Sequence, residues 1–279
     1  MQIGFNNKNE KEYQRLLNNL LKEIFFDFNF WYDLKLWDEN YESYSIMDNG
    51  EIVSNICVYE SQILFDNKQY SALSIGAVAT KNEYRGRGFS RKLMENIIEK
   101  YGHIPMYLSA NDSVVDFYPR FGFKRICEKL PVYEYKIDND IVPVKLQFDD
   151  PKVWNYVYNR KSISLKLDCI NSASINMFHI HSGYLKDCIY ELPEIETLII
   201  AEQKDTTIKL IGVFSLKDIS FSKFANYLPF RNINKIEFGF MPYWSDINFI
   251  MQEYTTDPIF VRGISCDLGE FKFPELSIT

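Results

Sequence analysis

The sequence has few of the side chains that build metal centres and disulfide frameworks. Its 279 residues include three histidines and five cysteines, and no two cysteines form a C-x-x-C pair. An odd number of widely scattered cysteines predicts neither a disulfide framework nor a zinc site, and a reducing compartment is the simplest setting. The cysteines are Cys57, Cys127, Cys169, Cys188 and Cys266.

Long apolar runs are absent as well. No stretch approaches the roughly 20 apolar residues that a membrane-spanning helix needs. The N-terminal segment MQIGFNNKNEKEYQ lacks the apolar core of a secretory signal. We therefore expect a cytoplasmic protein that has no membrane partner and binds no metal.

Positive charge is also scarce, with 31 Lys and Arg against 38 Asp and Glu and a net charge of −7. This balance argues against binding nucleic acid or an anionic membrane over the whole surface, although a local basic patch is compatible with it. The chain has instead abundant apolar bulk, including 22 Phe, 19 Tyr and 4 Trp. That bulk excludes disorder and suffices for the core of one large domain or two ordinary ones.

Periodic patterns predict a helix followed by a sheet. Residues 8–25 carry leucines at helical spacing, and the aromatic stretch FFDFNFWYDLKLWDENY that follows has no clean period. We interpret that stretch as core, with the wall of a binding groove as the alternative. Strand patterns flank the turn residues Asp48, Asn49 and Gly50, and QYSALSIGAVAT predicts a third strand before the helical segment SRKLMENIIEK.

The stretch YRGRGFSRKL, residues 84–93, lies between that strand and that helix. The first amides of a helix have no intrahelical partner and the helix dipole is positive there, so such a loop can bind an anion. Gly86 and Gly88 permit a close approach of the backbone, and Arg85, Arg87 and Arg91 add positive charge. The loop matches neither the P-loop nor the Rossmann pattern. Taken alone, it is equally compatible with a simple helix start.

Two segments together resemble a known family. V-A-T-x-x-x-Y-R-G-R-G-F-S-R-K-L-M resembles motif A of the GNAT superfamily of N-acetyltransferases, whose core is [QR]-x-x-G-x-[GA]. Ser90 stands at the final small position, which is a mild departure. N-D-S-V-V-D-F-Y-P-R-F-G-F resembles motif B, with Val114 where a small residue is common. The resemblance covers roughly residues 40–137.

The resemblance implies acetyl-CoA as co-substrate. Its pyrophosphate would bind the amides of Arg87 to Arg91, with the side chains of Arg85 or Arg87 assisting. The pantetheine arm would pair with the backbone of residues 78–80, where relatives splay their central strands. The cofactor-binding residues that it implies are Val78, Ala79, Thr80, Arg85, Gly86, Arg87, Gly88, Phe89, Ser90, Arg91 and Asn111.

The resemblance also implies direct acetyl transfer to an amine in a ternary complex, without an acyl-enzyme. Tyr118 would donate a proton to the departing thiolate, and a backbone N–H near Val78 would hold the oxyanion. The general base stays open among Ser74, Glu60 and Asp33. Two-part relatives of the enhanced-intracellular-survival type add the carboxylate of Thr279 as a further candidate.

The histidines do not indicate a site. His179 and His181 would share one face of a strand, but the surrounding pattern is helical and no third ligand is near. We therefore interpret both as packed or surface residues. His103 lies in a predicted turn and receives the same interpretation.

The predicted organisation is a GNAT N-acetyltransferase domain at 1–138, a linker at 139–143 and a C-terminal accessory domain at 144–279. The expected fold is α/β (α+β), with a mixed and mostly antiparallel central sheet in the first domain. The second half has no motif A. It is either a GNAT-like half that lost cofactor binding, retained to cover the acceptor side, or an unrelated α+β domain.

The predicted function is an acetyl-CoA-dependent N-acetyltransferase acting on a small-molecule primary amine. The negative net charge favours small cations such as polyamines or aminoglycosides as acceptors. The alternatives are an inert CoA-binding or sensing module and an RNA-binding module, although we expect no nucleic-acid partner. The sequence leaves a homo-oligomer open.

Overall fold

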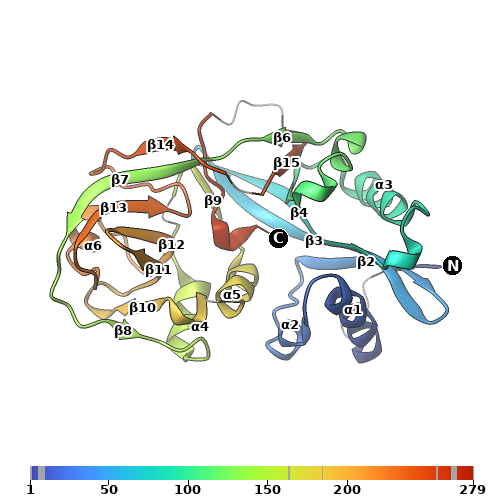
Figure 1. Ribbon diagram of the computed structural model, residues 1–279, viewed down its shortest axis with the longest axis horizontal. Coiled ribbons are helices and arrows are strands. Elements are labelled where there is room, and N and C mark those ends of the chain that lie inside the picture. The colour runs from blue at the N-terminus through green and yellow to red at the C-terminus, as the bar shows by residue number, and fades with distance from the viewer. Residues whose placement is uncertain are drawn as a thin grey trace.

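The computed structural model describes residues 2–5, 10–162, 164–183, 185–255, 257–264 and 269–278, the first range by its backbone alone. Two twisted sheets stand side by side, and each carries helices of its own half (Figure 1). Within the described residues, no helix is long and apolar enough to cross a membrane.

The elements run through the two halves in a similar order. The first half contributes β1 (Gln2–Phe5), α1 (Lys11–Ile24), α2 (Asn29–Asp33), β2 (Tyr41–Asp48), β3 (Glu51–Phe65), β4 (Lys68–Thr80), η1 (Asn82–Tyr84), α3 (Phe89–Tyr101), β5 (Met106–Ser109), η2 (Asp112–Val114), η3 (Tyr118–Phe121), β6 (Lys124–Ile126) and β7 (Lys129–Ile137). The second half contributes β8 (Val144–Lys145), α4 (Pro151–Asn159), β9 (Leu167–Cys169), α5 (Ala173–His181), η4 (Leu185–Asp187), β10 (Ile189–Leu192), η5 (Pro193–Ile195), β11 (Thr197–Lys204), β12 (Thr207–Ser215), α6 (Phe221–Ala225), β13 (Ile233–Phe238), β14 (Ile250–Glu253), β15 (Ile259–Arg262) and η6 (Glu275–Ser277).

Local chemistry accounts for the elements of the first half. The apolar face of α1, with Leu17 and Leu20 fully buried, packs against β3 and β4, as its helical spacing predicted. Asn49 and Gly50 both have positive φ, which matches the twist of a two-residue hairpin between β2 and β3. The predicted helix and the predicted turn are both confirmed.

The two sheets have the same layout. The first has the strand order β1-β2-β3-β4-β5-β15-β6, and the second has β8-β10-β11-β12-β13-β7-β14. In each sheet the fourth and fifth strands are parallel, while the remaining neighbours are antiparallel. The expectation of mixed, mostly antiparallel sheets is confirmed. The shared order favours the interpretation of the second half as a GNAT-like half.

Each sheet takes its sixth strand from the other half of the chain. β15 lies between β5 and β6 of the first sheet, and β7 lies between β13 and β14 of the second. The boundary between the sheets therefore does not coincide with the predicted linker at 139–143. Phe260 of β15 enters the core of the first half, and Ile137 of β7 enters that of the second. A third strand, β9 of the second half, also pairs with β3 at the side of the first sheet.

A buried ion pair holds one of these crossings. Glu128 lies where the chain passes from β6 to β7, and its Oε2 is 3.1 Å from Nζ of Lys272. The two side chains are 2% and 3% exposed. Oε1 of Glu128 also accepts from the amide of Phe273 at 2.6 Å. Burial raises the pKa of Glu128, and the charge of Lys272 partly offsets this shift.

We predict that Glu128→Ala lowers the free energy of unfolding by about 3 kcal/mol, because the buried Lys272 loses its nearest counter-charge and keeps only the carboxylate of Glu275 at 3.5 Å. Urea denaturation measures the change. The matched control is Asp218→Ala, which removes the partner of Lys161 in an ion pair that is 52% and 87% exposed. Asp218→Ala should lower the free energy of unfolding by no more than about 1 kcal/mol. Equal costs in the two variants would contradict the role given to the buried pair.

Candidate active site

The first sheet splits between β4 and β5. These strands pair only at Leu73 with Met106 and at Ser74 with Tyr107, and then diverge. Beyond the split lies a cleft of about 620 Å³. Residues 75–78 of β4 line one side, and residues 109–111 after β5 line the other. The strand separation implied by the family resemblance is therefore present at the expected place.

A β-bulge at the split shapes the backbone of β4. Asn55 is opposite Ala79, whereas Cys57 is opposite Gly76, so β4 carries one extra residue. Ala77 in the bulge has φ +47°, a left-handed conformation that costs a non-glycine residue roughly 1–2 kcal/mol. The amide of Asn55 donates to the carbonyl oxygen of Ala77 at 3.3 Å. Neighbouring side chains thus stabilise the strained bulge.

Asn55 is itself held in place by hydroxyl groups. Its Oδ1 accepts from Oγ of Ser43 at 2.7 Å and from Oγ of Ser45 at 2.8 Å. The hydroxyl of Tyr13 on α1 lies 2.9 and 2.8 Å from the same two serine oxygens. This buried network connects α1 through β2 and β3 to the bulge at Ala77, which lines the cleft.

A second cavity of about 310 Å³ surrounds the start of α3. Gly86 has φ +77°, and Gly88, the N-cap of α3, has φ +80°. Only glycine adopts this region without strain, so both glycines are needed for the shape of the loop. Arg85, Arg91 and Arg120 give the cavity positive charge. Because the free amides at the helix start lie here too, the cavity can bind a pyrophosphate.

The structure brings most of the predicted cofactor residues to these two cavities. Those that line them are Val78, Thr80, Arg85, Gly86, Gly88, Phe89, Ser90, Arg91 and Asn111. Ser90 hydrogen-bonds through its hydroxyl to Thr80 at 2.7 Å. Ala79 is buried in the core of α1 instead. The side chain of Arg87 donates to the carbonyl of Glu83 at 2.9 Å and stacks on Tyr84.

Tyr118 lies at the start of η3 on the wall of the larger cleft and is 4% exposed. Burial raises the pKa of its phenol to about 12, so the hydroxyl stays protonated at neutral pH. No described residue hydrogen-bonds to that hydroxyl. The rings of Phe117 and Phe123 pack around it, and Phe260 of the exchanged β15 lies 5.5 Å away between centroids. The site can therefore present a protonated phenol to a bound ligand.

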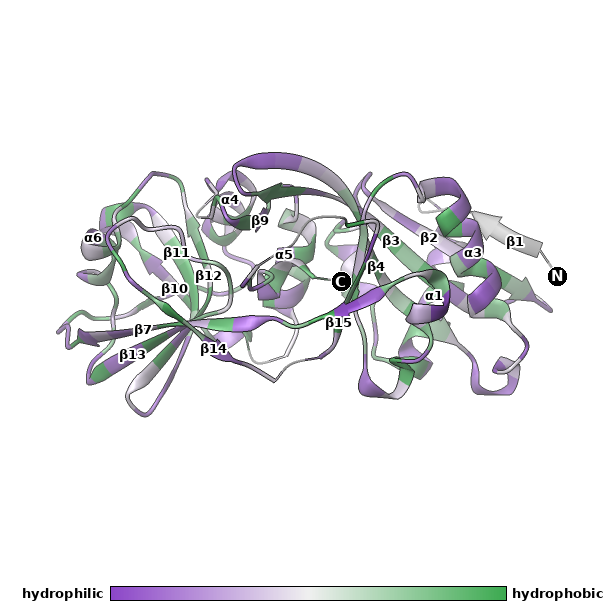
Figure 2. Cartoon of the chain, turned by 90° about the horizontal axis from the view of Figure 1, so that it is seen from above, coloured by the Kyte–Doolittle hydropathy of each residue, from purple (hydrophilic) through white to green (hydrophobic). Residues whose placement is uncertain are grey.

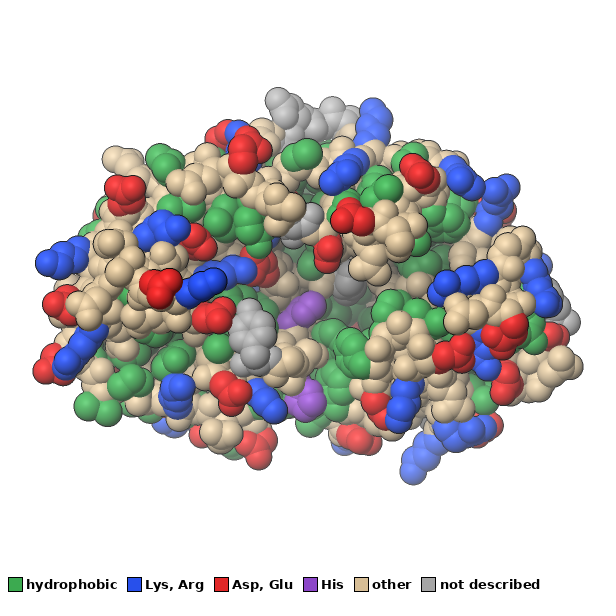
Figure 3. All heavy atoms as spheres, in the orientation of Figure 1, with side chains coloured by type: hydrophobic (Ala, Val, Ile, Leu, Met, Phe, Trp, Pro, Cys, Tyr) green, Lys and Arg blue, Asp and Glu red, His purple; other side chains and the backbone are tan. Residues whose placement is uncertain are grey.

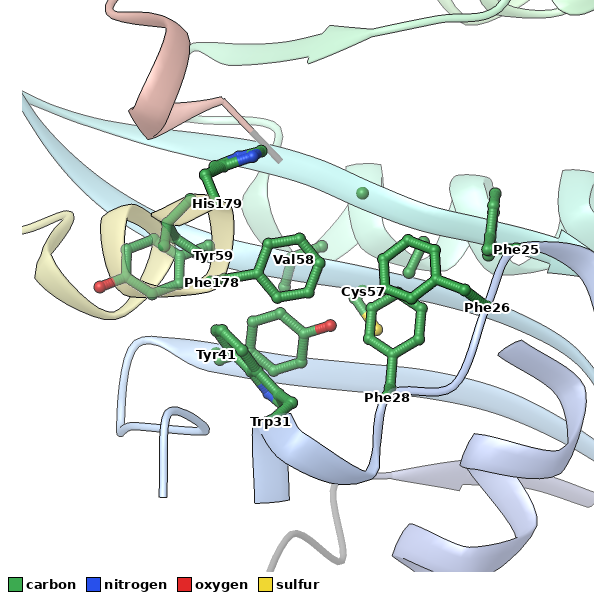
Figure 4. A pocket seen from close by; sticks show the side chains of 13 residues that line it. Phe25, Phe26, Phe28, Trp31, Tyr41, Cys57, Val58, Tyr59, Phe178 and His179 are labelled. Atoms are coloured by element: carbon green, nitrogen blue, oxygen red, sulfur yellow. The ribbon is translucent and has the colours of Figure 1, made fainter. Parts of the chain in front are cut away.

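A third cavity of about 180 Å³ meets the cleft at Phe25, Gly76 and Ala77. Figure 4 shows aromatic rings around it from several elements. They are Phe25, Phe26, Phe28, Trp31, Tyr41, Tyr59 and Phe178. The aromatic stretch at 25–41 thus forms core through Trp31 and Tyr41 and a pocket wall through its first phenylalanines. Both interpretations of that stretch hold for part of it.

The second half closes this pocket. Helix α5 supplies Ile175, Phe178 and His179 to the lining. Figure 3 shows the surface hollowed between the halves, with histidine and hydrophobic side chains beside the hollow. The C-terminal end of the chain lies in the same region, between the two sheets (Figure 2).

His179 is a pocket residue that sequence reasoning missed. Its Nε2 lies 2.7 Å from the carbonyl oxygen of Ile278. A carbonyl can only accept, so Nε2 carries the proton and Nδ1 keeps the lone pair of the neutral ring. Burial lowers the pKa of His179, while Ile278 and Glu275 oppose the shift. The ring is therefore neutral at pH 7.

His181 fits the sequence interpretation of a packed residue. Its ring stacks on Phe30 at 4.3 Å and meets Phe148 edge-on at 4.8 Å between centroids. Among the residues with described positions, no group of three or more His, Cys, Asp or Glu is arranged to hold a metal. The local sequence does not show that His179 lines the pocket whereas His181 packs between rings. That difference arises from how α5 packs against the first half.

The base candidates from the sequence lie elsewhere. Ser74 is fully buried, and the exposed Glu60 and Asp33 are not among the lining residues of the described cavities. Thr279 lies outside the described residues. Arg120, by contrast, was not anticipated, although it follows Tyr118 by two positions within motif B.

The corresponding opening in the second sheet is filled by the chain itself. Segment η6 packs there, and the amide of Glu275 donates to the carbonyl of Gly239 at 2.8 Å. A Cβ added to Gly212 would lie 2.7 Å from Cδ1 of Leu276. The remaining cavity is about 30 Å³, which is room for a water or two rather than a cofactor.

Comparisons with known proteins agree with this geometry. Residues 4–126 match the family model of the acetyltransferase (GNAT) domain. A UPF0039 protein of Synechocystis is 31% identical over 70 residues, which is 24% of this chain and 46% of that protein. The match thus spans about half the length of this curated relative.

Two solved structures share the fold of both halves. Eis1 from Mycobacterium abscessus aligns with a TM-score of 0.60 and 14% identity, over 94% of this chain and 72% of that one. A GCN5-related N-acetyltransferase from Anabaena variabilis aligns with a TM-score of 0.57 and 14% identity, over the same shares. At these identities the likeness concerns the fold alone.

Proposed function

We propose that this protein transfers an acetyl group from acetyl-CoA to a primary amine, because residues 4–126 match the model of the GNAT acetyltransferase domain. One observation carries the proposal. The cleft beside β4 and the aromatic pocket meet at the bulge of Gly76 and Ala77, with Tyr118 on the cleft wall. Two substrates that enter from opposite sides would bring their reacting groups together at that point.

The cleft suits acetyl-CoA as one substrate. Its pyrophosphate would bind the amides at the start of α3, beside Arg85, Arg91 and Arg120. Its pantetheine arm would lie along residues 75–78, where the edge of β4 that faces β5 has no partner strand. The thioester would then lie near the bulge, where a backbone N–H freed from the ladder can stabilise the oxyanion.

The reaction is a direct transfer. The amine nitrogen attacks the thioester carbonyl, forming the C–N bond, and the C–S bond breaks as the tetrahedral intermediate collapses. The amine loses one proton, and the departing thiolate takes up one from Tyr118. The phenol suits this role because its raised pKa keeps it protonated.

His179 is the proposed proton acceptor. It is a lining residue of the pocket that would hold the amine, and its Nδ1 has a free lone pair once Nε2 donates to Ile278. An alkyl amine with a pKa near 10 is about one part in a thousand neutral at pH 7, so its deprotonation costs roughly 4 kcal/mol. A neutral imidazole within reach, directly or through one water, accepts that proton.

We predict that Tyr118→Phe lowers kcat by about 10²-fold, since a thiolate leaving group needs only moderate acid assistance. Thiol release measured with DTNB reports the rate. Calorimetric affinity for acetyl-CoA should not change, because the ring and its packing remain. Unchanged turnover in Tyr118→Phe, with thiol release that does not depend on any amine, would favour the inert CoA-binding module.

We predict that kcat is level near neutral pH and falls only at acid pH, below the ordinary imidazole range, because protonated His179 cannot accept a proton. The sign follows from burial, which lowers the pKa of this imidazole and keeps it neutral above that range. His179→Gln should lower kcat by about 10²-fold or more and remove the acid limb. The matched control, His181→Gln, should keep the wild-type kcat and the acid limb of the pH profile. An acid limb that persists in His179→Gln would rule out the role of base.

We predict that Gly88→Ala raises the KM for acetyl-CoA by about tenfold and changes kcat less, because a Cβ at φ +80° distorts the phosphate loop. Gly50→Ala is the matched control. Gly50 also has φ +80° and open space around the added Cβ, but lies at the tip of the β2–β3 hairpin. Steady-state kinetics with varied acetyl-CoA separate the two variants. Equal KM values in both would contradict the phosphate cradle.

A further inference from the structure

The aromatic pocket has the size of a single ring. Its volume is about 180 Å³, and an engineered apolar cavity of about 150 Å³ binds benzene. An aminoglycoside with several sugar rings is far larger. The pocket therefore sets an upper limit on the group that can accompany the amine next to the bulge.

The pocket wall offers almost no polar contact. Its described lining residues include no Asp, Glu, Lys or Arg. The hydroxyl of Tyr59 donates to the carbonyl of Asn171 at 2.7 Å, so this hydrogen bond is already made within the protein. The carboxylate of Asp38 accepts from Tyr59 and Ser174 at 3.1 and 2.6 Å and is not a lining residue. A second ammonium group would thus lose its hydration without gaining a partner, which is costly.

The lip of the pocket exposes apolar rings. Phe25 and Phe26 are 42% and 44% exposed. Phe26 stacks on Phe28 at 4.5 Å and on Phe178 of α5 at 6.0 Å between centroids. Such rings present flat faces on which another ring can stack. Figure 4 shows Phe25 and Phe26 on one side of the cavity and Phe178 and His179 toward the other.

These observations point to the acceptor class. We propose that the acceptor is a primary amine attached to one aromatic ring or to an apolar group of similar size. The ring lies in the cavity against the stacked rings of Phe26, Phe28 and Phe178, and the amine nitrogen faces His179 and the bulge. This inference rests on the proposed function, and it places the acceptor in a class different from the polycations that the net charge of the chain favours.

The test compares amines with acetyl-CoA at fixed concentration. Benzylamine and phenethylamine are the single-ring probes, 2-naphthylmethylamine is the two-ring probe, and spermidine and kanamycin are the polycations. We expect kcat/KM for the single-ring amines to exceed that for spermidine at least about 100-fold, since a buried unpaired charge is disfavoured. Equal or better turnover of either polycation would overturn the inference and leave the acetyltransferase function standing. Absence of thiol release with every amine would instead contradict the proposed function.

A matched pair of variants locates the effect. Phe26→Ala should raise the KM for benzylamine about 5–20-fold through the lost ring contact and leave the KM for acetyl-CoA unchanged. Tyr158→Ala, which removes a ring that is 48% exposed on α4 outside the pocket, should change neither. If Phe26→Ala instead changes the kinetics of hexanoyl-CoA and not of benzylamine, the pocket holds the acyl chain and the inference is wrong.

Discussion

The separation of β4 from β5 is the constraint on which the rest of this structure depends. Once the strands part beyond Ser74 and Tyr107, their facing backbone groups need other partners. The bulge at Ala77 is the local response, and it brings the cleft and the aromatic pocket together at one point. The site is therefore built chiefly from backbone geometry, with a few side chains such as Tyr118 and His179 placed around it.

A split sheet needs support from outside, and the exchanged strand provides it. β5 has four residues and is covered on its free edge by β15 from the distant end of the chain. Phe260 of β15 packs against Tyr118, and Arg262 donates to the carbonyl of Phe121 at 3.0 Å. The second half thus packs against Tyr118 as well as closing the aromatic pocket. Calling it an accessory domain understates its part in the site.

The two sheets share one layout but differ in what fills the opening. In the first, the space beside β4 is a cleft of about 620 Å³; in the second, η6 occupies it and leaves about 30 Å³. The same segment continues to Ile278, whose carbonyl fixes the tautomer of His179. The C-terminal segment that fills the opening in the second sheet therefore also hydrogen-bonds to His179 beside the cleft of the first sheet. The second half thus contributes directly to the pocket beside the first sheet.

The sequence by itself determined the glycine loop before α3 and the segment that carries Tyr118. The loop glycines and the free amides at the start of α3 are local features, so YRGRGFSRKL and NDSVVDFYPRFGF were enough to predict where the two cavities beside β4 and α3 would lie. Tertiary structure decided the remainder. His179 and Phe178 reach the pocket from α5, more than 100 residues after the β4 bulge, and β15 and β7 exchange sheets. Such pairings depend on which distant apolar faces bury one another, and no local pattern in the sequence records that choice.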